Sequence, residues 1–270
     1  MVTSSTTSSL VPINWISANS RKSKSKKIVI ADSVASEGLQ LCAHSLVGKL
    51  YSDKPVKLFG MRKTLSEAWD CDGLQMYQIK ELMFQFLIPL EEDSERILRN
   101  YPWSFDGDLL SIQQWVPEFQ FYPESFRSVP FWIRITNVPL DLMTEGAPKE
   151  LASSFLTCEK VEVHDLGFAG GRYIRIRVCV DVSKPFRRGL RIVHEGKRKW
   201  TKLRYERLPS LCYFCGRVGH AVRCCPSKLD SDPIDDRQFG CWLKASGLVG
   251  KLLKNQKGSS SANSSFGPLP

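Results

Sequence analysis

The strongest constraint on this chain is a cluster of metal-ligand side chains toward its C-terminal end. Cys212, Cys215, His220 and Cys225 have the spacing C-x2-C-x4-H-x4-C within fourteen residues. Tetrahedral zinc prefers thiolate and imidazole donors, and a two-residue gap lets one turn hold the ion from two sides. We therefore predict one structural zinc ion on these ligands. Because they fill a tetrahedral site, no coordination position remains for a catalytic water.

Two neighbouring features bear on this predicted site. Gly216 follows the first turn and Gly219 precedes the histidine, positions where a chain that wraps a metal ion needs positive φ. Cys224 would give an x3 spacing and is an alternative fourth ligand to Cys225. The remaining interpretation is a cysteine-rich loop without metal, which requires all four donors and both glycines to fall in place by chance.

The other cysteines and the hydropathy indicate a soluble protein of a reducing compartment. The nine cysteines are odd in number and mostly scattered singly, unlike a disulfide framework. We recognise no secretory signal, and no apolar run approaches the roughly 20 residues of a membrane-spanning helix. We expect a nuclear or cytoplasmic location and no membrane partner. A plastid location is the alternative, because residues 1–30 are Ser-rich and lack acidic residues.

The positive charge is concentrated in one part of the chain. Residues 186–228 contain twelve lysines and arginines against two acidic residues, so their net charge of +10 equals that of the whole protein. A charge run is usually a solvated face. Because this one immediately precedes and includes the predicted zinc site, we expect it to contact phosphate groups.

Hydrophobic patterning predicts an α+β protein in which two blocks of strands and helices follow one another along the chain. Residues 41–118 have strands at 45–50, 76–79, 82–88 and 109–115 and helices at 58–70 and 91–100. This βαββαβ order is typical of a ferredoxin-like or RRM-like sandwich. Residues 119–209 repeat part of it, with strands at 131–135, 161–164 and 172–180, a helix at 142–156 and a basic hairpin at 187–193 and 199–206. A single larger α+β domain is the alternative.

The remaining segments flank these blocks. We predict a disordered, Ser/Thr-rich basic tail at 1–40, a zinc knuckle at 210–226 and a C-terminal tail at 227–270. The basic run at 21–27 is either a solvated tail or an arm for nuclear localisation or nucleic acid. Within the strand at 172–180, alternation places Arg175 and Arg177 on one face and the aliphatic side chains on the other.

Aromatic and basic residues in and before the knuckle are candidates for binding single-stranded RNA or DNA. Such knuckles stack an exposed base on an aromatic side chain while cations hold the phosphates. Tyr213 and Val222 are the predicted apolar platform, with Arg217 and Arg223 beside it. The predicted basic approach includes Arg187, Arg188, Arg204 and Arg207. In the competing interpretation, Tyr213 and Phe214 only shield the sulfurs or dock the knuckle on the preceding block.

Several segments together are similar to a known family. They are 46–50 (LVGKL), 102–105 (PWSF), 130–135 (PFWIRI), 182–185 with 187–189 (VSKP, RRG), 204–209 (RYERLP), the knuckle, and 239–240 with 242–245 (FG, WLKA). The chain resembles plant proteins that pair an N-terminal domain of unknown function with a CCHC zinc knuckle. These are often found in the gag-like part of non-LTR retrotransposons or in genes derived from them.

The resemblance implies a zinc-binding, nucleic-acid-binding protein of retroelement type, and it favours Cys225 as the fourth ligand. Two departures add thiols without removing a ligand: Cys224 doubles the last cysteine, and Cys241 stands where relatives commonly have proline. We recognise no reverse-transcriptase or ribonuclease segment, so we expect either a truncated element or a host gene.

Two other functions are alternatives to nucleic-acid binding. An enzyme has little support, because no Walker A loop, G-x-S-x-G or H-E-x-x-H motif is present. The alternative is a protein-interaction or self-assembly module, in which the knuckle is only structural and Trp242 and Leu243 serve packing. Under either view we expect four tryptophans to be core residues: Trp69, Trp103, Trp115 and Trp132.

Overall fold

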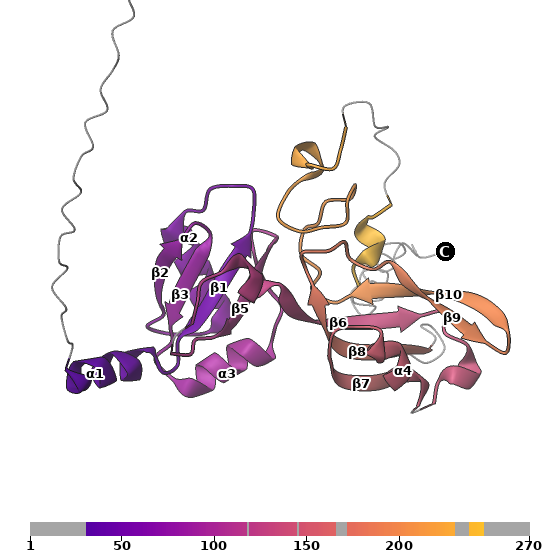
Figure 1. The fold of residues 1–270 in the computed structure, drawn as a ribbon, viewed down its shortest axis with the longest axis horizontal. Helices are drawn as coiled ribbons and strands as arrows, with labels where there is room; N and C mark the ends of the chain where they lie inside the picture. Colours follow the sequence, from indigo (N-terminus) through magenta and orange to yellow (C-terminus); the bar gives the residue numbers. More distant parts are fainter. Residues whose placement is uncertain (1–30, 118, 145, 166–171, 230–237, 246–270) are drawn as a thin grey trace, which may run out of the picture.

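Two five-stranded antiparallel sheets form the body of the protein, as a computed structural model shows (Figure 1). The structure describes residues 31–117, 119–144, 146–165, 172–229 and 238–245. The predicted basic run at 21–27 lies outside the described residues. Residues 32–40, which the sequence analysis assigns to the tail, belong to a helix, α1 (Asp32–Cys42), none of whose side chains is buried.

The first sheet confirms the predicted α+β order. Its elements are β1 (Leu46–Tyr51), α2 (Leu58–Trp69), β2 (Gln75–Lys80), β3 (Met83–Leu87), α3 (Glu91–Arg99), β4 (Trp103–Phe105) and β5 (Asp108–Gln114). The strand order is β2-β3-β1-β5-β4. Without β4, this is the split βαββαβ arrangement of a ferredoxin-like sandwich. The short strand β4, which pairs with β5, is not among the predicted strands.

The second sheet has the same topology as the first. Its elements are β6 (Ser128–Thr136), η2 (Leu140–Leu142), α4 (Ala147–Ser153), β7 (Cys158–Asp165), β8 (Arg172–Asp181), β9 (Gly189–His194) and β10 (Lys197–Tyr205). Its order β7-β8-β6-β10-β9 matches the first when β6 to β10 replace β1 to β5. The difference lies between β8 and β9, where residues 182–188 stand in place of a second helix.

The helices of the first unit cover one face of its sheet. In α2, Met61, Leu65 and Trp69 are buried at a spacing of four residues, which is one helix face. In α3, three acidic residues occupy the first turn and two arginines the last turn, as the helix dipole favours, while Ile97 is buried. The facing side chains on β1 and β3 include Leu46, Leu50, Phe84 and Phe86, all at most 1% exposed.

The opposite face of the first sheet is covered by the connection to the second. This connection contains η1 (Pro123–Phe126), and Phe126 is 1% exposed. Its carbonyl accepts hydrogen bonds from the Ser111 hydroxyl (2.9 Å) and the Tyr51 hydroxyl (3.1 Å). Trp115, Phe119 and Phe121 pack around it. The chain itself therefore covers both faces of the central strands of the first sheet, whereas Tyr77 and Ile79 stay exposed on the edge strand β2.

In the second unit, strict alternation separates a buried face from a polar one. Ile174, Ile176 and Val178 are fully buried, whereas Arg175 and Arg177 point to the other side, as predicted. The predicted helix at 142–156 is wrong in extent, because only 147–153 is α-helical. Of the earlier part of the predicted helix, Leu142 ends the 3-10 turn η2. Pro148 lies near the α4 N-terminus, where a missing N–H costs no helical bond.

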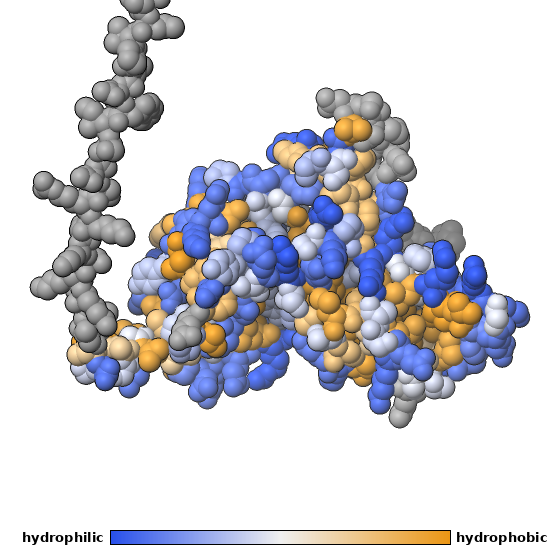
Figure 2. All heavy atoms as spheres, in the orientation of Figure 1, coloured by the Kyte–Doolittle hydropathy of each residue, from blue (hydrophilic) through white to orange (hydrophobic). Residues whose placement is uncertain are grey.

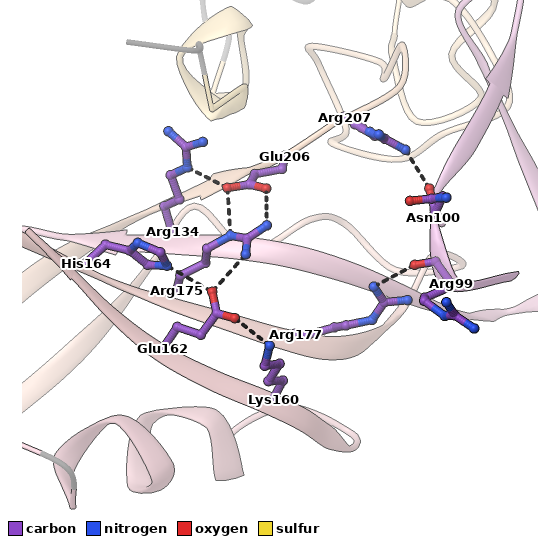
Figure 3. A network of polar contacts seen from close by, with 10 residues as sticks. All are labelled: Arg99, Asn100, Arg134, Lys160, Glu162, His164, Arg175, Arg177, Glu206 and Arg207. Atoms are coloured by element: carbon purple, nitrogen blue, oxygen red, sulfur yellow. Dashed lines mark hydrogen bonds and ion pairs between the residues drawn. The ribbon is translucent and has the colours of Figure 1, made fainter. Parts of the chain in front are cut away.

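The polar face of the second sheet carries a network of ion pairs (Figure 3). Glu206 accepts from Arg134 Nε at 2.6 Å and from Arg175 Nη2 at 2.8 Å, and Arg175 Nη1 also reaches Glu162 at 2.8 Å. The Arg175 guanidinium stacks 3.6 Å above the Trp132 ring. Trp132 is thus partly buried beneath an arginine on the polar face, whereas of the four predicted core tryptophans only Trp69 is fully buried.

We predict that Glu206→Gln destabilises the fold by about 1–3 kcal/mol, because Arg134 and Arg175 lose their shared carboxylate in a partly buried site. Urea unfolding measures the change. The matched control is Glu95→Gln, which breaks the exposed pair with Arg99 and should cost less than about 0.5 kcal/mol. Equal losses for the two variants would contradict the assigned role of Glu206.

A pH dependence follows from Glu162. Lys160 and His164, with a smaller contribution from Arg175, hold the pKa of this carboxyl at about 2, below its ordinary 4.5. A depressed pKa stabilises the fold fully above pH 4.5, and this contribution is lost as pH falls toward 2. We therefore predict that Glu162→Gln makes the unfolding free energy fall less steeply with acidification across this window. Parallel curves for variant and parent would refute this.

Candidate metal centre and basic surface

The predicted ligands come together in the folded chain. One ligand atom from each of Cys212, Cys215, His220 and Cys225 lies within 4.8 Å of all the others, a cluster able to hold one metal ion. Cys212 and Cys225 are buried, and the other two are partly exposed. Cys224 is exposed and outside the cluster, so the geometry favours Cys225 over Cys224 as the fourth donor. Three sulfurs and one imidazole are a typical donor set for structural zinc.

The local backbone shapes this cluster. Gly216 has φ of 73° and Gly219 has φ of 92°, so the positive φ predicted for both glycines is confirmed. The Cys212 carbonyl accepts from the Gly216 N–H, and the Cys212 N–H donates to the Arg217 carbonyl, each at 2.8 Å. This tight turn brings the first two sulfurs to one side of the site.

Backbone donors face the sulfurs. Burial raises the pKa of the Cys215 thiol to about 12, and the Arg217 N–H acts in the opposite direction. Burial also opposes ionisation of Cys225, but N–H groups of Ser227 and Lys228 and the neighbouring cysteines bring its pKa below the ordinary value. Such donors support thiolates, the form in which cysteine binds metal.

The knuckle is attached to both sheets. Toward the second sheet, Phe186 N–H donates to the Gly216 carbonyl at 2.8 Å, and the Phe186 ring packs edge-on against Phe131 and Tyr205. Toward the first sheet, the Ala221 N–H donates to Asp53 Oδ2 at 3.0 Å. A further backbone hydrogen bond joins Ser210 N–H to the Gly107 carbonyl at 2.7 Å. The cluster therefore lies at the junction of the two units.

Phe239 closes the knuckle from the other side. A Cβ on Gly216 would lie 2.4 Å from the Phe239 ring, so the ring sits directly on glycine backbone. Phe239 N–H donates to the Tyr213 carbonyl at 3.3 Å, and Leu243, shortly after it, is fully buried. Residues 239–243 thus pack on the knuckle and on the core.

The predicted nucleic-acid contacts fall into separate places. Arg217 and Arg223 are exposed on the knuckle, while Tyr213 and Val222 are only partly exposed. Two of the upstream arginines brace the fold: Arg187 donates to the Ser154 carbonyl at 2.7 Å, and Arg207 donates to the Asn100 carbonyl at 2.5 Å. The other two, Arg188 and Arg204, line a groove on the second sheet.

That groove contains aromatic residues which the sequence analysis did not propose as contacts. Its volume is about 790 Å³, and its lining side chains include Arg188, Trp200, Lys202, Arg204 and Trp242. Trp200, Lys202 and Arg204 alternate along β10 on the face opposite the buried Leu203, so period-two spacing was a usable signal for Trp200. Trp242, assigned to packing in the rival interpretation, is 53% exposed.

The surface of the molecule is polar where the two sheets meet. Hydrophilic side chains gather across the junction of the two sheets and around the knuckle (Figure 2). Among the described residues, no helix is long and apolar enough to cross a membrane.

Two family models match the chain. One, described as a domain of unknown function (DUF4283), covers residues 38–123, and the other, described as a zinc knuckle, covers residues 180–227. The second match begins at residue 180, before the ligands, and so includes the segment that holds the knuckle on the sheet. The Arabidopsis thaliana protein named "Uncharacterized protein At4g02000" is 25% identical over 131 residues, which are 48% of this chain and 41% of that protein. The chain thus spans less than half of this relative's length.

Two solved structures, one of RNA-binding domains and one of a protein–RNA complex, show weak similarity. The N-terminal three RNA-binding domains of the yeast splicing factor Prp24 are 14% identical, with a TM-score of 0.23, over 52% of this chain and 55% of that one. The Sxl-lethal protein in a complex with RNA is 12% identical, with a TM-score of 0.23, over 60% and 98% of the chains. At these scores the similarity carries no conclusion about what this chain binds.

The position of Cys225 generates a prediction. Cys225→Ser should reduce bound zinc from about one ion per chain to near zero, because it removes a buried thiolate donor, whereas Cys224→Ser should leave the stoichiometry unchanged. Elemental analysis of purified protein, together with a colorimetric zinc-release titration, makes the comparison. Loss of zinc in the Cys224 variant alone would reverse the assignment.

Proposed function

We propose that this chain binds single-stranded nucleic acid through a zinc-stabilised knuckle and the basic surface beside it, without catalysis. The observation that carries the proposal is the union of a CCHC cluster with a segment, residues 186–228, whose net charge is +10. Cationic side chains that neutralise phosphates release counterions and supply sequence-independent affinity. Four protein donors leave a tetrahedral ion no open position, so the metal's role here is structural.

The charge of this surface is free to act on a ligand. Among the described residues, none of Arg188, Lys202, Arg204, Arg217 and Arg223 forms an ion pair with an acidic side chain, in contrast to Arg134, Arg175 and Arg177. The unpaired cations belong to the knuckle and to β10 with the segment before β9. The paired ones lie on β6 and β8 of the same polar sheet face that carries Arg204, and acidic side chains neutralise their charge.

The alternative is a protein-interaction or self-assembly module. It is favoured by the attachment of the knuckle to both units, through Asp53 on one side and Phe186 on the other, because a knuckle that only joins two sheets needs no ligand. We prefer nucleic acid, because a structural joint gives no reason for unpaired arginines on the solvent side of the knuckle.

The retroelement origin is also a proposal. It rests on the sequence segments that resemble gag-like plant proteins, together with the pairing of a DUF4283 match with a zinc-knuckle match. A nuclear or cytoplasmic location accords with such a protein and with unpaired cysteines.

We predict that the purified, zinc-loaded chain binds a fluorescein-labelled oligothymidine and an oligouridine with an affinity that falls steeply with salt. Arg223→Ala and Arg217→Ala should each reduce the slope of log affinity against log salt by roughly 0.7–1, because each removes a phosphate contact. Fluorescence anisotropy at several salt concentrations measures the slope.

Arg62→Ala on α2 is the matched control, because Arg62 is exposed and far in sequence from the basic segment. Tyr213→Ala and Cys225→Ser should weaken binding by roughly fivefold or more, through loss of stacking and of the folded knuckle. No binding of either oligonucleotide at low salt would overturn the proposed function.

A further inference from the structure

We propose that the groove on the second sheet is a second stacking site for single-stranded nucleic acid, built by Trp200 and Trp242 between three cations. The proposal rests on the nucleic-acid binding proposed above and deepens it by locating where bases are held outside the knuckle. The groove is lined by Arg188, Lys202 and Arg204 and by no acidic side chain among the described residues. A polyanion with flat apolar bases fits this chemistry.

The centres of the other two sheet faces are covered, although Tyr77 and Ile79 stay exposed on the edge strand β2 of the first sheet. The second face of the first sheet is covered by Phe126 and its aromatic neighbours. On the second sheet, Arg175 lies over Trp132 and is paired with Glu206 and Glu162, so the central aromatic ring is already stacked and its cations are neutralised. The groove differs from both in having exposed rings beside unpaired cations.

The two tryptophans are held in place by bare backbone. A Cβ on Gly189 would lie 2.5 Å from the Trp200 ring, and a Cβ on Gly240 would lie 2.1 Å from the Trp242 ring. Each ring therefore rests closely on a glycine, and yet the side chains remain 47% and 53% exposed. Aromatic rings fixed before binding lose little conformational entropy when a base stacks on them.

The groove is connected to the knuckle through Phe239. This ring packs on Gly216, and the Arg188 guanidinium lies 5.5 Å from its centre on the groove side. Arg188 also donates to the Gln238 carbonyl at 3.4 Å. The C-terminal segment is fixed to β10 by a bond from Ala245 N–H to the Tyr205 carbonyl at 2.8 Å, which sets Trp242 beside the strand that carries Trp200. One strand of nucleic acid can thus contact the knuckle and the groove together.

The test is anisotropy titration of oligothymidine with the full, zinc-loaded chain. Trp200→Ala and Trp242→Ala should each weaken binding by roughly fivefold to a hundredfold, the effect of losing one base stack, with the salt slope unchanged. Arg204→Ala should instead lower the salt slope by roughly 0.7–1. Tyr77→Ala, which removes a 50% exposed aromatic ring from the first sheet, is the control and should leave affinity unchanged.

A gentler variant guards against misfolding. Gly240→Ala keeps every groove side chain and has an extended backbone that any residue adopts, but its methyl group must displace the Trp242 ring. It should weaken binding while leaving the urea unfolding midpoint within error. Quenching of intrinsic fluorescence by oligothymidine should shrink in the Trp200→Ala, Trp242→Ala double variant beyond the loss expected from two fewer fluorophores.

The outcomes separate this inference from the proposed function. Binding that persists at parental affinity in folded Trp200→Ala, Trp242→Ala and Gly240→Ala variants overturns the groove and leaves knuckle-based binding intact. The same groove substitutions can be made in a chain that already carries Cys225→Ser. If they weaken binding there as they do in the parental chain, the result supports an independent second site. Equal, tryptophan-dependent binding of polyglutamate would assign the groove to an acidic protein and overturn the inference.

Discussion

The contact of Phe239 and Phe186 with Gly216 is the interaction on which the position of the knuckle against the second sheet depends. Gly216 offers bare backbone to the Phe239 ring and a carbonyl to the Phe186 N–H, so the metal cluster is fixed to the second sheet rather than suspended on a linker. A side chain at this position would collide with the ring, and its φ of 73° already disfavours any residue but glycine. The knuckle consequently has a defined orientation relative to β10 and its cations.

Comparison of the two sheets, which share one topology, shows which part of the second unit holds Gly216 of the knuckle. Between β3 and β4 the chain forms α3, which buries Ile97 against the first sheet. At the equivalent point between β8 and β9 it forms residues 182–188, and Phe186 fills the core position instead. A shorter connection leaves backbone groups available, and one of them bonds the knuckle. Where the first unit has a helix, the second unit thus has a segment that holds the knuckle.

Charge is used in two different ways on the same sheet. Arg134, Arg175 and Arg177 face Glu206, Glu162 and Glu159, and their guanidinium groups serve stability and cover Trp132. Arg188, Lys202 and Arg204, on β10 and just before β9, have no such partners among the described residues and flank exposed tryptophans. The net charge of a segment therefore overstates the number of cations that are available to a ligand. Arg187 and Arg207, for example, donate to backbone carbonyls within the fold.

The sequence by itself determined the elements governed by local rules. Periodicity predicted most of the strands and the helix that buries Met61, Leu65 and Trp69. Ligand chemistry predicted the cluster, because zinc donors at fixed short spacing lie within one short segment. Only the tertiary structure decided between Cys224 and Cys225, and only it placed Trp200 beside Trp242, whose separation of 42 residues in the chain leaves no local signal. Contacts between distant segments depend on how the faces of sheets and helices pack. The hydrophobic period of the sequence alone cannot specify which exposed side chains meet.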